Sequence, residues 1–184
     1  MKQLILSLTL FRIIAGPIIF LLAVFFEAYL TSFFMFIIAS ITDYLDGSLS
    51  RKYNLTSKMG AVLDPIADKI LVTFMFLVIA LHINNAFISL FIALILAREF
   101  WVSGLREMNS INQNPQSTQV SWLAKVKTTL QMTCIGLYLW GFAFHYALVI
   151  FISHFILFLV LLITIRTGLD YTLESYNQYS KHDK

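Results

Sequence analysis

Long apolar stretches alternate with short polar links along the whole chain. The apolar stretches run at about residues 4–26, 31–49, 61–82, 86–107, 122–144 and 147–171. Each is close to the ~20 residues that an α-helix needs to cross the hydrocarbon core of a bilayer. The pattern therefore predicts an all-α integral membrane protein whose six transmembrane helices form a single domain over residues 1–184.

The composition supports this class and excludes others. Hydrophobic residues make up 59% of the 184 residues and charged residues only 12%, which is too apolar for a soluble domain. The net charge is only +3 and the basic residues are spread along the ends of the apolar stretches, so we expect no nucleic-acid partner. Cys134 is the single cysteine, which excludes a disulfide within the chain.

The basic residues predict the orientation in the membrane. The first, third and fifth links, at residues 27–30, 82–85 and 145–146, contain no Lys or Arg. All 13 Lys and Arg residues then fall on one side of the membrane or in the helix halves nearest to it. Under the positive-inside rule that side is the cytoplasm. We therefore expect a multi-pass protein of the inner (cytoplasmic) membrane, with both termini and the link between the second and third helices in the cytoplasm.

Four aspartates flank that link in two pairs. Asp43 and Asp46 are three residues apart, and Asp64 and Asp68 are four apart. At about 100° and 1.5 Å per residue, each spacing puts two carboxylates on one helix face, one turn apart. The polar link between the pairs suits a turn that joins antiparallel helices. All four carboxylates are therefore expected to converge near the cytoplasmic ends of two helices.

Converging carboxylates repel one another unless cations neutralise them. Hard oxygen donors of this kind are ligands for Mg²⁺ or Mn²⁺, and we expect two ions. Two such ions can hold a pyrophosphate and stabilise both the entering and the leaving oxygen of a phosphoryl displacement. In the alternative interpretation the aspartates face water and pair with nearby cations, namely Arg51, Lys52, Lys58 and Lys69.

Charged residues also interrupt the fourth and fifth apolar stretches. Arg98, Arg106, Lys125 and Lys127 lie inside these stretches, toward their cytoplasmic ends. Because Arg offers a two-pronged donor and Lys a point charge, the four residues are candidates for binding a phosphate group. Alternatively, they extend to anionic lipid headgroups or pair with the adjacent glutamates. The spacing alone favours neither interpretation.

Eight positions of the aspartate region follow one pattern, Asp43-x2-Asp46-Gly47-x2-Ser50-Arg51-x8-Gly60-x3-Asp64-x3-Asp68. The pattern resembles the signature of the CDP-alcohol phosphatidyltransferases, in which the position of Ser50 is usually Ala. The resemblance implies a two-metal site that transfers a phosphatidyl group from a CDP-lipid to an alcohol and releases CMP. It also implies that Gly47 and Gly60 admit the cytidine nucleotide and that Arg51 helps to hold the CDP group. Asp68 would take the proton from the alcohol.

Other parts of the chain resemble the same family. The segments AREF, LRE and VSWLAKVKTT are similar to the corresponding region of bacterial phosphatidylglycerophosphate synthases. This likeness implies CDP-diacylglycerol and sn-glycerol 3-phosphate as substrates. It assigns the acceptor's phosphate to Arg98, Arg106, Lys125 and Lys127, with Arg12 as an additional candidate. The segment SLTLFRIIAGP resembles the family's opening and implies an N-terminal interfacial segment at residues 4–12. The family also often forms homodimers.

Two other functions remain open at this stage. The acceptor can be a different alcohol, such as inositol phosphate, serine or phosphatidylglycerol. From another class, the aspartates can line the path of a divalent-cation channel or carrier. That alternative gives no role to Gly47, Arg51 or Gly60. A carrier would also need carboxylates near the middle of the membrane, whereas these lie toward one end.

Overall fold

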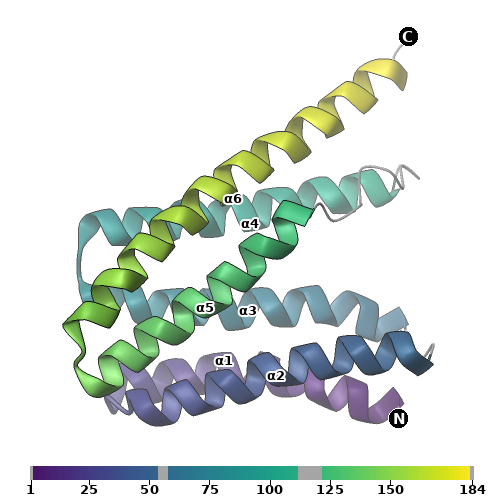
Figure 1. Cartoon of the computed structure of the whole chain (residues 1–184). Helices are drawn as coiled ribbons and strands as arrows, with labels where there is room; N and C mark the ends of the chain where they lie inside the picture. Colours follow the sequence, from purple (N-terminus) through teal and green to yellow (C-terminus); the bar gives the residue numbers. More distant parts are fainter. Residues whose placement is uncertain (1, 54–57, 112–121, 183–184) are drawn as a thin grey trace. The chain divides into compact units, whose positions relative to one another are not determined.

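A computed structural model describes the backbone of residues 2–53, 58–111 and 122–182. Within these ranges it describes the side chains apart from those of residues 2, 4–5, 44–53, 58, 61, 111 and 178–182. The described residues form six helices and no strand, which confirms the predicted all-α class (Figure 1). The helices are α1 (Lys2–Phe25), α2 (Tyr29–Tyr53), α3 (Lys58–Ile83), α4 (Ala86–Ile111), α5 (Trp122–Phe144) and α6 (Ala147–His182).

The helices follow the predicted apolar stretches but extend beyond them at the polar ends. The largest extension is in α6, which continues past residue 171 to His182. Hydropathy marks only the apolar length of a helix, whereas the backbone hydrogen bonds continue into polar residues until a cap or a break ends them. α1 is continuous from Lys2 to Phe25. The predicted interfacial segment at residues 4–12 is the first part of this helix, and its place at a membrane surface stays a prediction.

Four helical segments of the described chain are long and apolar enough to cross a membrane. They are Leu6–Phe25, Val62–Ile83, Ala86–Ser110 and Ala147–Asn177. α2 contributes a shorter apolar stretch, Tyr29–Asp43, and α5 carries Lys125, Lys127 and Gln131 in its first three turns. The chain is therefore a multi-pass membrane protein, and the number of six spans stays a prediction.

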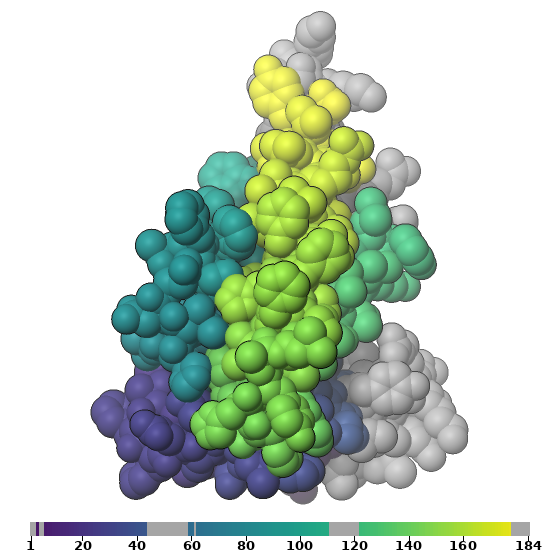
Figure 2. All heavy atoms as spheres, turned by 60° about the vertical axis from the view of Figure 1, so that its left-hand side comes forward, coloured from purple at the N-terminus to yellow at the C-terminus, as the bar shows by residue number. Residues whose placement is uncertain are grey.

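The outer face of α6 fits a lipid environment. Large apolar side chains recur on it every three to four residues and are exposed, as at Phe155, Phe158, Leu162, Leu169 and Leu173. Figure 2 shows ring-bearing side chains projecting from the yellow-green surface of this helix. In water such a stripe would be unfavourable, but lipid tails are as apolar as these side chains.

The chain divides into two compact units. The first comprises Met1–Asn84 and Cys134–Ser153, and the second comprises Asn85–Thr133 and His154–Lys184. In the first unit α1 lies close against α3, since a Cβ added at Gly16 would lie 3.3 Å from the Leu71 Cα. Small residues at such positions let two helix backbones approach closely. The prediction of one domain is not tested by this division.

In α1, α2 and α3 of the first unit, the buried face of the helix leads to a charged residue. On α1 the buried positions Ile19 and Ala15 are continued by Arg12, one turn nearer the N-terminus. On α2 the buried residues Phe36 and Ala39 lie on the same face as Asp43, since the three are spaced three or four residues apart. On α3 the buried Leu71 follows Asp68 by three residues and shares its face in the same way. Because residues three or four apart share a helix face, the packing of these helices turns their polar ends toward one another.

Candidate functional site

Three of the four predicted carboxylates converge on one guanidinium in the first unit. Arg12 Nη1 donates hydrogen bonds to Asp43 Oδ1, at 2.5 Å, and to Asp68 Oδ1. Arg12 Nη2 lies 3.3 Å from Asp64 Oδ1. We call Asp43, Asp64 and Asp68 the carboxylate cluster. The side chain of Asp46, the fourth predicted ligand, lies outside the described residues.

The guanidinium is enclosed while the carboxylates remain open. The side chain of Arg12 has no exposed surface, whereas those of Asp43, Asp64 and Asp68 are 40%, 40% and 42% exposed. Thr9 Oγ1 also donates a hydrogen bond of 2.7 Å to Asp64 Oδ1. The protein therefore holds the carboxylates from the inner side and leaves part of each accessible to a further ligand.

The donor chemistry of the carboxylate cluster fits a hard divalent cation. Three ionised carboxylates beside one guanidinium leave a formal charge of −2, and this excess attracts additional positive charge. Carboxylate oxygens are the donors that Mg²⁺ and Mn²⁺ prefer. Among the described residues, however, no three His, Cys, Asp or Glu side chains are arranged to hold a metal ion. The position between the carboxylates is taken by Arg12.

The predicted nucleotide-binding residues are described only in part. The backbone of α2 includes Gly47 and Arg51, but the Arg51 side chain lies outside the described residues. Gly60 is buried in the first turn of α3, one turn before Asp64. The structure therefore places Gly60 beside the carboxylate cluster along the helix, as the spacing predicts.

The second unit holds a group of basic side chains around Glu99. Lys127 Nζ donates a hydrogen bond to Glu99 Oε1, and Arg98 Nη1 lies 3.6 Å from the same oxygen. All three side chains are at most one-fifth exposed. Arg106 and Arg98 both contact Tyr171, and we call Arg98, Arg106 and Lys127 the cationic cluster. Pairing with an adjacent glutamate therefore holds for Lys127 and Arg98, yet the cluster keeps an excess of positive charge.

Residues of α6 hold the two arginines in place. Arg98 Nη2 donates a hydrogen bond of 2.7 Å to Thr167 Oγ1, and Arg106 Nη2 donates one of 2.7 Å to Tyr171 Oη. The guanidinium carbons of Arg98 and Arg106 lie 5.9 and 4.8 Å from the centre of the Tyr171 ring, within the range of cation–π attraction. A Cβ added at Gly168 would lie only 2.9 Å from Arg98 Cγ, so this glycine leaves room for the arginine.

Two candidate phosphate ligands lie elsewhere. Lys125 is exposed on α5, whereas Lys127 is buried. Side chains two positions apart on a helix differ in direction by about 200°, so the two lysines lie on different faces of α5. Arg12, the additional candidate, lies in the first unit with the carboxylate cluster.

Sequence reasoning did not identify Arg12 as the partner of the carboxylate cluster, whereas pairing with the adjacent glutamates was one of its two interpretations for the basic residues around Glu99. Arg12 and Glu99 are charged residues inside predominantly apolar segments, and this is the sequence signal that could have identified both as members of a buried polar group. Which opposite charge each one meets depends on a neighbouring helix, and this information is absent from local spacing.

Comparison with known proteins identifies the family of this chain, and the matched range includes both clusters, though not Tyr171 and its neighbours in α6. The family model described as CDP-alcohol phosphatidyltransferase matches residues 6–166. A protein of Salmonella choleraesuis (strain SC-B67) is 41% identical over 137 residues, which cover 72% of this chain and 74% of that protein. A protein of Escherichia coli (strain K12) is 38% identical over 136 residues, with the same coverage. Both are named CDP-diacylglycerol–glycerol-3-phosphate 3-phosphatidyltransferase. The chain belongs to the CDP-alcohol phosphatidyltransferase family.

Proposed function

We propose that this chain transfers the phosphatidyl group of CDP-diacylglycerol to sn-glycerol 3-phosphate, giving phosphatidylglycerophosphate and CMP. The observation that carries the chemistry is the convergence of Asp43, Asp64 and Asp68 on the guanidinium of Arg12. The choice of acceptor is supported by the names of relatives about 40% identical to this chain. The cationic cluster supports it too, because an acceptor that carries a phosphate needs fixed positive charge.

The metal ligands of the proposal are Asp43, Asp46, Asp64 and Asp68, and the ions are two Mg²⁺ or Mn²⁺. Bound ions supply electrostatic stabilisation of the charge on the pyrophosphate and on the leaving CMP. The exposed part of each described carboxylate supports this assignment, since the ligands would be open to the substrate side. Gly47, Gly60 and Arg51 are proposed to accommodate the cytidine nucleotide.

We assign the role of general base to Asp68. The carboxylate of Asp68 takes the proton from the acceptor hydroxyl, whose oxygen forms a bond to the lipid-side phosphorus. The bond between that phosphorus and the oxygen of CMP breaks in the same displacement, and CMP leaves. No Ser, Cys or His takes part as a nucleophile in this scheme, so phosphatidyl transfer is direct.

The acceptor phosphate is assigned to Arg98, Arg106 and Lys127, with Lys125 as a fourth predicted ligand. The fork of a guanidinium matches two phosphate oxygens, and Lys127 adds a point charge. In the membrane we propose six spans, with both termini and the site on the cytoplasmic side of the inner membrane, and a homodimeric assembly.

The acceptor assignment predicts a selective release of CMP. Purified protein in detergent with CDP-diacylglycerol and Mg²⁺ is expected to release CMP with glycerol 3-phosphate, and not with inositol phosphate, serine, phosphatidylglycerol or no acceptor. Released CMP is measured by chromatography, and the lipid product by mass spectrometry. Release with another acceptor would refute the acceptor assignment alone. Failure with every acceptor, together with Mn²⁺ uptake into protein-containing liposomes, would favour the cation-transport alternative.

Gly168→Ala is expected to raise the KM for glycerol 3-phosphate roughly tenfold while changing kcat much less. The added methyl group would lie 2.9 Å from Arg98 Cγ and 3.1 Å from its Nε, so the arginine must move from its bond to Thr167. The loss of a hydrogen bond that involves a charged group costs about 1.5–3 kcal/mol, and a loss of this kind in substrate binding appears in KM. Gly104→Ala on α4 is the matched control, because its Cβ would meet nothing within 4 Å. An unchanged KM in Gly168→Ala would exclude Arg98 from the acceptor site.

A further inference from the structure

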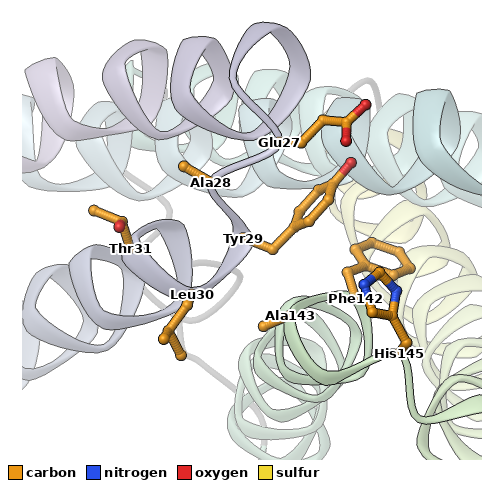
Figure 3. Close-up of a pocket in the computed structure, with 8 residues that line it drawn as sticks. All are labelled: Glu27, Ala28, Tyr29, Leu30, Thr31, Phe142, Ala143 and His145. Carbon is orange, nitrogen blue, oxygen red and sulfur yellow. The ribbon is translucent and has the colours of Figure 1, made fainter.

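A pocket lies in the first unit where the α1–α2 link meets the end of α5. Its volume is about 220 Å³, and residues 27–31, 142–143 and 145 line it (Figure 3). Figure 3 shows the Glu27 carboxylate and the Tyr29 hydroxyl extending in the same direction from the α1–α2 link. Tyr29 and Asp43 are fourteen residues apart on α2, which corresponds to about 21 Å at 1.5 Å per residue. The pocket is therefore distinct from the carboxylate cluster.

Two residues of this pocket hold an unfavourable backbone conformation. Glu27 has φ 51° and His145 has φ 54°, in the left-handed region where glycine is the usual residue after a helix. Each such residue costs free energy, and conformations of this kind concentrate at functional sites. Asn84, with φ 47°, adopts the same conformation in the α3–α4 link, but Asn tolerates it better and Asn84 does not line the pocket.

The walls of the pocket combine negative charge with fixed aromatic rings. Glu27 is exposed and supplies a carboxylate. Tyr29 Oη and His82 Nδ1 are hydrogen-bonded at 2.6 Å, and the rings of Tyr29 and His82 lie 5.6 and 4.1 Å from that of Phe142. The links at residues 26–28, 84–85 and 145–146 contain no Lys or Arg. A carboxylate beside aromatic faces, with no Lys or Arg in these links to pair with it, suits an ammonium group.

His145, which also lines the pocket, indicates which second group a bound molecule carries besides the ammonium. An imidazole ring offers an N–H donor, which suits a phosphate oxygen. The pocket also lies where membrane-crossing segments end, since Leu6–Phe25 stops two residues before Glu27 and Ala147–Asn177 begins two residues after His145. The exposed residues Phe25, Phe26 and Tyr146 are close in the sequence to Glu27 and His145, and aromatic side chains gather at the headgroup level of a bilayer.

We infer that this pocket binds the headgroup of a zwitterionic phospholipid, with its ammonium at Glu27 and its phosphate at His145. The site is separate from that of the CDP-lipid and does not depend on the proposed transfer reaction. Phosphatidylethanolamine carries this headgroup chemistry, whereas phosphatidylglycerol lacks the ammonium.

The test uses a substitution that removes the carboxylate without endangering the fold. Glu27→Gly removes the side chain and also relieves the left-handed backbone, so a rise in Tm of roughly 1–4 °C is expected. Asn84→Gly is the matched control, with the same backbone change outside the pocket. The full-length protein in detergent is titrated with dihexanoyl phosphatidylethanolamine, and bound lipid is counted by native mass spectrometry.

Glu27→Gly is expected to need at least about tenfold more phosphatidylethanolamine for the same occupancy, a loss of about 1.4 kcal/mol. Asn84→Gly should bind like the wild type, and phosphatidylglycerol of the same chain length should bind weakly to all three proteins. Unchanged lipid binding in Glu27→Gly, or equal binding of phosphatidylglycerol to the wild type, would overturn the inference. Free phosphoethanolamine that binds as tightly as the lipid would also overturn it, by making the ligand a soluble compound.

CMP release separates this inference from the proposed function. Glu27→Gly should release CMP within about twofold of the wild-type rate, because the pocket lies about 21 Å along α2 from the carboxylate cluster. A lost lipid preference with normal CMP release supports the second lipid site. If the wild type binds phosphatidylethanolamine but releases no CMP, the transferase proposal is refuted and the pocket remains a lipid site.

Discussion

Asp68→Asn is expected to slow CMP release by at least about 10²-fold, since a positioned general base contributes roughly 10²–10⁴-fold to a rate. Asparagine has nearly the shape of aspartate, and its amide oxygen can still accept the hydrogen bond that Arg12 Nη1 donates to Asp68 Oδ1. It cannot take a proton from a hydroxyl, and it brings no negative charge to a cation. The loss should therefore fall on turnover rather than on folding.

The measurement is the initial rate of CMP release from CDP-diacylglycerol, together with the Tm of each protein. Asp170→Asn is the matched control, because Asp170 is a half-exposed carboxylate of the second unit that pairs with Arg166 at 3.5 Å. This control should keep the wild-type rate. An Asp68→Asn protein with a normal Tm and a rate within a few-fold of the wild type would remove Asp68 from the mechanism.

Arg12→Leu is expected to destabilise the metal-free protein by about 2–4 kcal/mol. Removing one partner of a buried ion pair costs about 3–5 kcal/mol, and the cost is reduced here because the carboxylates are 40–42% exposed. Without the guanidinium, Asp43, Asp64 and Asp68 face one another as like charges. A lower Tm in EDTA is the direct sign of this repulsion.

The same substitution should tighten the binding of Mn²⁺. Arg12 takes the position between the carboxylates, so a metal ion must displace it or share its partners. We therefore expect the Tm of Arg12→Leu to rise more on adding Mn²⁺ than that of the wild type, with free Mn²⁺ followed by electron paramagnetic resonance. Arg166→Leu removes an exposed ion pair and should change neither quantity appreciably. Weaker Mn²⁺ binding in Arg12→Leu would show instead that the arginine holds the ligands in place for the metal.

The two clusters show what local spacing can predict. Asp64 and Asp68 share a helix face because they are four residues apart, and this holds wherever the helix lies. The apolar stretches predicted the helices for a similar reason, since their lengths follow from the bilayer and the helical rise. Gly60 precedes Asp64 by one turn in the sequence and in the helix alike.

Contacts between helices were not accessible in this way. Nothing in the spacing of Arg12 indicates that its guanidinium meets three aspartates from α2 and α3. Lys125 and Lys127 look equivalent in the sequence, yet the structure buries only Lys127 beside Glu99. The role of Gly168 depends on an arginine about 70 positions away in the chain.

The sequence by itself thus determined the helices, the paired carboxylates and the family signature. All three depend on periodicity or on residue identity at fixed separations. The tertiary structure decided which charges neutralise one another and which side chains share a pocket. The physical reason is that a helix fixes the relative directions of its own side chains, whereas the partner of each face depends on how separate helices pack.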